Sequence, residues 1–211
     1  MYALVENNQI SKYLNGNKGI TIGENQYSKS IFRLWTEEER NAIGIYSVTI
    51  DTTNKRNEEY YINTDITYAY ANGAVTGSYG TPTAKPLNNI LFTQADADAD
   101  EIPSDKAVGD INQHGLKEEK IRIIKQQAAD LLAPTDWYVV KASEVSGYTV
   151  PADITTFRAA VRTKSNEMET MINGVADVDA LEALYKYTNT GTEETPDYTR
   201  PLGEFPESPV E

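Results

Sequence analysis

The sequence predicts an α+β protein: a small N-terminal β-rich domain with a short helix, followed by a C-terminal helical hairpin with a third short helix. Residues 1–80 contain short alternating runs of apolar and polar residues, which are typical of strands. Residues 114–187 repeat apolar residues roughly every three to four positions, as helices do. The intervening residues 81–113 and the final residues 188–211 carry net charges of −4 and −5, out of −13 for the whole chain. We expect the first to be an acidic, proline-containing linker and the second an acidic, proline-rich tail.

Two hairpins are expected in the β-rich part, which we interpret as a docking domain. Asn7 and Asn8 separate the runs "YALV" and "QISKYL", while Asn72 and Gly73 separate "YYINTDITYAY" from "AVTGSY". An Asn-Gly pair is the strongest short hairpin signal, because a type I′ turn needs a positive φ at both central residues. The strands on either side of each pair should therefore be antiparallel neighbours.

One short helix should interrupt these strands. Thr36 and Glu39 have the spacing of a capping box, with further acidic residues in the first turn, and Gly44 should end the helix. The run "IGIYSVTI" that follows alternates like a strand. Three of its residues compete for the buried face: Ile43, Ile45 and Tyr46.

The acidic linker invites comparison with a calcium loop, because "DADADE" places acids at the first, third and fifth positions. The comparison fails at the sixth position, where Glu101 stands in place of glycine, and at the twelfth, where Ala107 replaces a bidentate glutamate. A solvated acidic linker is the better interpretation, and "LFTQADADAD" is compatible with a short helix. About thirty structureless residues would be unusual inside one domain, so the two sides should be separate domains.

The C-terminal part should form three helices. The first has an apolar face made by Leu116, Ile121, Ile124, Ala128 and Leu131. The second should begin near Pro151, and its apolar residues fit heptad a and d positions, interrupted once by Lys164: Ile154, Phe157, Val161, Met168, Met171 and Val175. In the third, Asp179 and Glu182 make a capping pattern, while Leu181, Leu184 and Tyr185 should face inward.

The stretch "LLAPTDWYVV" should form the corner between the first two helices. Pro134 lacks an N–H and should end the first helix near Leu132. Asp136 can then turn back on the local backbone, Trp137 should be buried as an anchor, and the following residues should form a short β-like run. The sequence leaves open whether Arg158 and Arg162 pair with Asp136 and Glu144 inside the fold or with another chain.

Several classes of chemistry find no support in the sequence. The chain has no cysteine, its one histidine is His114, and the glycine-rich stretch 15–23 lacks the spacing of a phosphate loop. We therefore predict no catalytic residues, no cofactor and no metal site. A net charge of −13 opposes binding to nucleic acid. No run approaches the ~18 apolar residues of a membrane span, and the N-terminus does not look like a signal peptide.

The helical part resembles a known module. Its order is Leu131-Leu132, Asp136-Trp137, Pro151, Phe157-Arg158 and Arg162. This order resembles the C-terminal module of tail assembly chaperones and tail-fibre-associated proteins of tailed phages, with Phe157 in place of the usual Tyr and Val161 in place of Leu. The resemblance implies a non-enzymatic tail protein. The candidate interaction residues are Asp136, Trp137, Tyr138, Phe157, Arg158, Val161, Arg162 and Met168.

Two functions remain open on this basis. The first is a structural protein of the phage virion, in the tail, baseplate or fibre attachment, which is made in the host cytoplasm and forms homo-oligomers. The alternative is a tail-fibre assembly chaperone that is absent from the mature virion. In both cases the partners are other phage tail proteins or fibre subunits. The fourteen tyrosines, mostly in the β-rich part, could form a contact surface or occupy half-buried strand positions.

Overall fold

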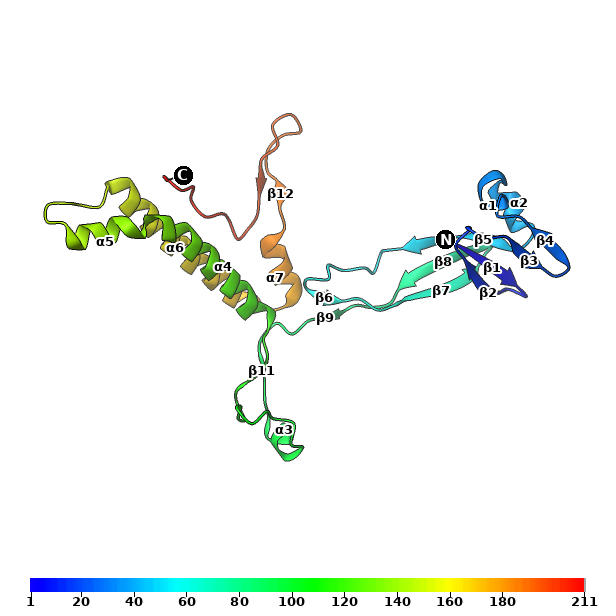
Figure 1. Ribbon diagram of the computed structural model, residues 1–211, viewed down its shortest axis with the longest axis horizontal. Coiled ribbons are helices and arrows are strands. Elements are labelled where there is room, and N and C mark those ends of the chain that lie inside the picture. The colour runs from blue at the N-terminus through cyan, green and yellow to red at the C-terminus, as the bar shows by residue number, and fades with distance from the viewer. Residues whose placement is uncertain (211) are drawn as a thin grey trace. The chain divides into compact units, whose positions relative to one another are not determined.

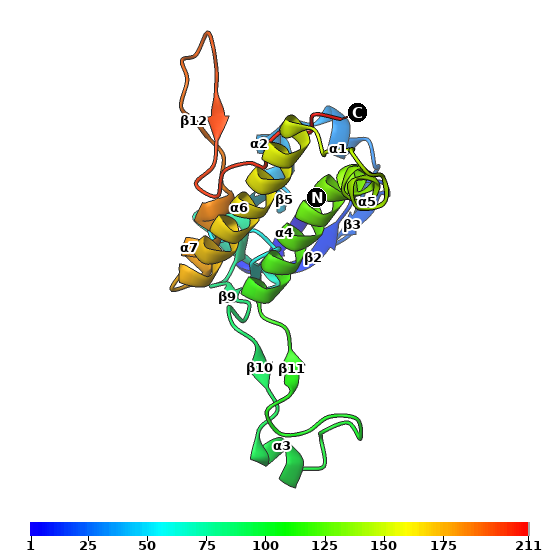
Figure 2. The same cartoon turned by 90° about the vertical axis from the view of Figure 1, so that its left-hand side faces the viewer.

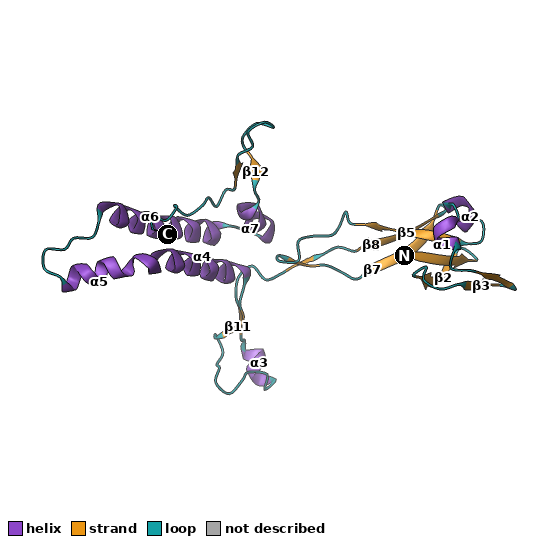
Figure 3. Cartoon of the chain, turned by 45° about the horizontal axis from the view of Figure 1, so that its top comes forward, coloured by secondary structure: helices purple, strands orange, loops and turns teal. Residues whose placement is uncertain are grey.

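The computed structural model describes residues 1–210 and divides the chain into two compact units, Met1–Thr83 and Ala84–Glu211. Strands dominate the first unit and helices the second (Figures 1 and 3). The α+β class predicted from the sequence is therefore confirmed.

Unit 1 is built on a five-stranded sheet. In spatial order its strands are β2 (Gln9–Leu14), β1 (Tyr2–Glu6), β5 (Ile45–Asp51), β8 (Ala74–Tyr79) and β7 (Ile66–Ala71). Neighbours are antiparallel except for β5 and β8, which run parallel. Strand β1 pairs with the first half of β5 and β8 pairs with the second half. The central strand β5 therefore joins two hairpins into one sheet.

Both predicted hairpins are confirmed. The turn between β1 and β2 has φ of 52° at Asn7 and 60° at Asn8, and the turn between β7 and β8 has 52° at Asn72 and 77° at Gly73. These are the positive angles that a type I′ turn requires. Asparagine tolerates this backbone region better than other residues with side chains, which explains why it occupies three of the four positions.

The sheet curls so that its edge strands approach each other. The rings of Tyr13 on β2 and Tyr68 on β7 have centroids 5.1 Å apart. Tyr68 lies over Gly77 of β8, where an added Cβ would stand 2.6 Å from the ring. The hydroxyls of Tyr46 and Tyr70 are hydrogen-bonded at 3.0 Å. Apart from Tyr13, these tyrosines are half-buried, which favours the strand-position interpretation over a contact surface.

The first helices and a small ribbon pack on the sheet. The core that they form with it contains Leu4, Ile20, Ile31, Phe32 and Ile45. The elements are β3 (Ile20–Ile22), β4 (Asn25–Tyr27), α1 (Ile31–Leu34) and α2 (Glu37–Asn41), and the short strands β6 (Tyr61–Ile62) and β9 (Thr83–Ala84) pair farther along the chain. The predicted capping box of Thr36 and Glu39 is present at α2. Gly44 has a φ of +82°, and a Cβ there would meet the Val5 carbonyl at 2.7 Å.

Unit 2 is built on two long helices, α4 (Leu116–Leu132) and α6 (Ala152–Gly174), which lie side by side (Figures 2 and 3). They are antiparallel, because Lys117 near the start of α4 donates to the Asn173 carbonyl near the end of α6. Helix α7 (Val178–Tyr185) follows, with Leu181 fully buried. Its N-cap is Asp177, whose side chain accepts from Ala180 N–H, so the prediction of a cap at Asp179 is wrong by two residues.

The buried stripe of α6 follows a helical period, not a heptad. Its buried residues are Ile154, Phe157, Val161, Ser165, Met168 and Ile172. Ile154 and Ile172 are five turns of about 3.6 residues apart, as in an undistorted helix. The heptad prediction is correct for the first half of the helix, while Met171 and Val175 are only half-buried. Helices of 17 and 23 residues do not need the supercoil that a heptad sustained over many turns imposes.

The segments expected as linker and tail both contain ordered elements. An arm, residues 88–113, consists of β10 (Ile90–Leu91), α3 (Gln94–Asp98) and β11 (Ile111–Gln113), and it leads away from α4 (Figures 1 and 2). After α7, the strands β12 (Thr188–Asn189) and β13 (Tyr198–Thr199) form a second ribbon. The chain then returns along α6 (Figure 1). Leu202 is fully buried there, so this part of the tail is folded.

Candidate functional site

The predicted interaction residues fall into two groups in the structure. Phe157, Val161 and Met168 lie inside the hairpin, with exposed fractions of 6%, 0% and 0%. These three form the seam between the helices and present no surface to a partner. The remaining five lie at or near the end of the hairpin where α4 turns: Asp136, Trp137, Tyr138, Arg158 and Arg162.

The bend after α4 is not the expected β-like corner. Pro134 lies in a short 3-10 helix, η1 (Ala133–Thr135), and the chain continues as helix α5 (Asp136–Glu144). Proline is tolerated in the first turn of a helix, so Pro134 ends α4 at Leu132 as predicted without stopping helical structure. The residues Tyr-Val-Val have a high strand propensity, but local helical context overrides it here.

Arg158 holds this bend together. Its guanidinium donates to the Leu132 carbonyl at 3.1 Å and also to the Thr135 hydroxyl, and it pairs with the Asp136 carboxylate at 2.8 Å. The Arg158 side chain is 11% exposed, whereas that of Asp136 is 61% exposed. The Leu132 carbonyl is one of the groups that a helix end leaves without an internal partner. The sequence left open whether the arginines pair inside the fold or with another chain. Arg158 pairs with Asp136 inside the fold.

Helix α5 and its C-cap expose four apolar side chains, which together we call the tip surface: Trp137, Val139, Val140 and Val145. Their exposed fractions range from 44% to 52%, and no residue of α5 is buried. The prediction that Trp137 is a buried anchor is therefore wrong. Its ring packs instead on Tyr138, with centroids 3.8 Å apart.

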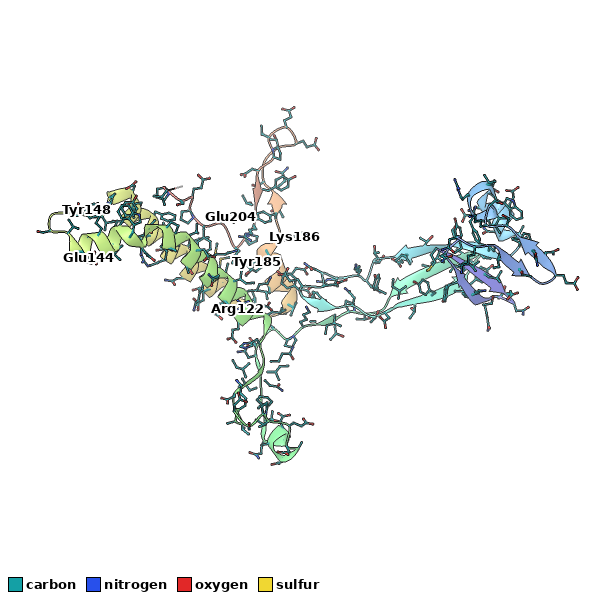
Figure 4. All side chains as sticks on the ribbon, viewed as in Figure 1. Arg122, Glu144, Tyr148, Tyr185, Lys186 and Glu204 are labelled. Atoms are coloured by element: carbon teal, nitrogen blue, oxygen red, sulfur yellow. The ribbon has the colours of Figure 1, made fainter. Side chains whose placement is uncertain are left out.

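A lysine sits among the aromatic rings of the tip. The Lys141 ammonium lies 5.6 Å from the Trp137 ring centroid and 4.5 Å from that of Tyr148. Figure 4 places Tyr148 and Glu144 at this end of the hairpin. Such contacts orient the Trp137 ring without removing it from solvent. The tip is thus pre-shaped, exposed and apolar, the properties that mark protein contact sites.

Residues 200–206 form an ordered segment, which we call the strap and which the sequence analysis did not predict. Phe205 packs against the seam cluster of Ala128, Phe157 and Val161. At the other end, Arg200 pairs with Glu204 at 2.7 Å. The sequence does contain a sign of this packing. Leu202 and Phe205 are three residues apart and are the large apolar side chains of the last dozen residues.

The only histidine, His114, lies just before α4. Its Nδ1 is 3.0 Å from the Glu118 carboxylate. Hydrogen bonds from His114, and then from Asn89, lower the pKa of Glu118. Both side chains are well exposed, and a hydrogen-bonded pair at a helix start is explained by structure alone. Residues 1–210 hold no group of three His, Asp or Glu side chains placed to bind a metal ion.

The aspartates that suggested a calcium loop lie in and after α3. The Asp96 carboxylate accepts from the backbone and hydroxyl of Thr93, which caps the helix and lowers the pKa of Asp96. A carboxylate used in this way is turned toward its own backbone. The arrangement agrees with the interpretation of this segment as acidic surface.

Comparisons with known proteins add no relative. No protein-family model matches the chain, and no curated protein or solved structure matches it. In the part of the chain that the structure describes, every helix is too short or too polar to cross a membrane.

Proposed function

We propose that the chain is a non-enzymatic structural protein of a bacteriophage tail, acting in the tail, baseplate or fibre attachment through protein–protein contacts. The observation that carries the proposal is that several ordered elements of unit 2 bury none of their own residues. No residue of α5 or α3 is buried, and both strands of the β12–β13 ribbon are exposed. Two-stranded ribbons are marginally stable alone, so partners that cover them are expected.

The link to phage tails rests on the residue pattern. Two polar members of that pattern, Asp136 and Arg158, form an ion pair at the bend. This gives the pattern a physical role, because it fixes the direction in which the tip surface points. The expected partners are other tail proteins or fibre subunits, together with further copies of the chain in the virion.

A second candidate function is that of a tail-fibre assembly chaperone. The tip surface favours it, because a chaperone exposes apolar residues to hold an unfinished partner, and Trp137 and Val140 are about half exposed. The acidic composition would keep such a protein soluble. A chaperone leaves when assembly ends, so the two candidates differ in where the chain is found.

Mass spectrometry of purified mature particles, compared with infected-cell lysate, separates these functions. A copy number that matches a tail symmetry, measured against the major capsid protein, supports the structural role. Presence in lysate with absence from particles supports the chaperone and overturns the structural role. Absence from tail complexes in both samples overturns both candidates.

A further inference from the structure

Unit 1 has two adjoining hollows of about 770 and 480 Å³, and both are lined in part by Gly16. Together we call them the basic cleft. Four cationic side chains line it: Lys12, Lys18, Lys29 and Arg33. Neither hollow has a carboxylate in its lining. This is unusual in a chain with 32 acidic and 19 basic residues.

The four cations are free to meet a partner. All four are exposed, and within residues 1–210 none of them forms an ion pair. The floor of the larger hollow is apolar, with Ile20 and Phe32 from the core of unit 1. The rim of the smaller one carries Leu34, which is 79% exposed. The cleft therefore suits a partner that offers several carboxylates beside apolar side chains.

The arm carries both carboxylates and exposed apolar side chains. Between residues 96 and 110 it carries six acids and one lysine. Some of these acids serve the arm itself, since Asp98 accepts from Gln94 and Asp110 accepts from Ala107 N–H. Three others have no side-chain partner in the described part of the chain: Asp100, Glu101 and Asp105. Three large apolar residues of the arm are also exposed, by 43% to 50%: Ile90, Leu91 and Val108.

The base of the arm is fixed while its end is free. Asn89 accepts from Gly115 N–H at 2.8 Å, which ties the base of the arm to the start of α4. Gly115 is required there, because a Cβ would stand 2.3 Å from the Asn88 carbonyl carbon. No residue of α3, nearer the end of the arm, is buried. A rigid base with an unpartnered end suits an element that inserts into a neighbour.

We propose that the basic cleft of one copy binds the arm of a second copy, so that copies join head to tail. The two surfaces differ, so the interface is heterologous and builds a ring or an open filament. The inference rests on the proposed function only in requiring that the chain works as an oligomer. Nucleic acid is the weaker occupant, because a phosphate backbone offers no apolar side chains to cover the exposed Leu34 at the rim. At about 0.1 M salt, charges beyond about 10 Å are screened, so the local attraction outweighs the distant repulsion.

Sedimentation velocity of the full chain with two charge-reversed variants tests this. One variant changes the cleft, Lys12→Glu with Lys18→Glu, and the other changes the arm, Glu101→Lys with Asp105→Lys. The wild type should self-associate beyond a dimer, and each variant alone should associate at least about tenfold more weakly, equivalent to about 1.4 kcal/mol. An equimolar mixture of the two variants should regain association, because the intact cleft of one variant binds the intact arm of the other, and the reversed cleft and reversed arm also carry opposite charges.

The matched control is Asp65→Lys with Glu207→Lys, which reverses two exposed acids outside the arm and the basic cleft and should associate like the wild type. A monomeric wild type overturns the proposal. This holds also if heparin, used as a polyanion probe, binds the cleft of the monomer, or if the arm folds onto the cleft of its own chain. Association that survives both reversals also overturns it. These measurements use the purified chain and not phage particles. A failure of the head-to-tail proposal can therefore be told apart from a failure of the proposed function, which is tested by whether the chain is present in virions.

Discussion

Unit 2 has a buried seam between the helices α4 and α6 and an exposed tip on α5, the helix that follows α4. In the seam, Phe157 and Val161 of α6 pack against Ala128 of α4 and the strap. At the tip, Trp137 and Val140 face solvent although they are as apolar as the seam residues. The difference teaches that apolar character alone does not assign a role. The seam stabilises the fold, and the tip is available for partners.

The largest expected effect is at the seam. Phe157→Ala should lower the free energy of unfolding of unit 2 by about 3–5 kcal/mol, because it empties a closed site. Denaturant unfolding followed by far-ultraviolet circular dichroism measures this, since nearly all of the helix lies in unit 2. Phe157→Leu is the control and should cost less than about 1.5 kcal/mol. An unchanged midpoint for Phe157→Ala would mean that the seam is an interface between copies and not a core.

The strap should contribute almost as much as the seam. Leu202 is fully buried, so Leu202→Ala should destabilise unit 2 by about 2–5 kcal/mol in the same assay. Limited proteolysis gives a second readout, because a released strap exposes its backbone to cleavage. Val210→Ala, beyond the strap and only half-buried, should leave cleavage unchanged. Equal protease resistance of the Leu202 variant and the wild type would contradict the packing of the strap.

The seam could be predicted from sequence much better than the strap. Apolar spacing located α4 and α6 and the residues Phe157, Val161 and Met168, because burial along a helix repeats with the helical period. The strap has no period, and its contacts depend on where the chain travels after β13. Proline and acidic residues around Leu202 indicate disorder when only local composition is considered.

The bend between seam and tip should show an intermediate effect. Arg158→Ala removes the donor to Leu132 and the partner of Asp136, and should cost about 1–3 kcal/mol. Asp136→Asn removes only the exposed half of the ion pair and should cost less than about 1 kcal/mol. Denaturant unfolding of both variants with the wild type measures the difference. Equal losses would mean that the ion pair, and not the Leu132 carbonyl, holds the bend.

The tip shows where sequence reasoning reaches its limit. The sequence singled out Asp136, Trp137 and Arg158 as candidate interaction residues, and Asp136 and Arg158 form an ion pair. The burial of Trp137 was inferred from its size and its place beside Pro134. Whether a helix end packs on something depends on the rest of the fold, and Pro134 bends the chain without returning it to the seam.

The smallest effect on stability, and the sharpest contrast with the seam, is expected at Trp137. Trp137→Ala should change the free energy of unfolding by no more than about 0.5 kcal/mol, because its ring is 51% exposed and leaves no closed cavity. Exposure can be measured directly by acrylamide quenching in a Trp35→Phe background, where the single remaining indole should be readily quenched. When tail proteins or fibre subunits are added, quenching should fall if the tip is covered. A strongly protected Trp137 in the free chain would place it in a core and remove the distinction between tip and seam.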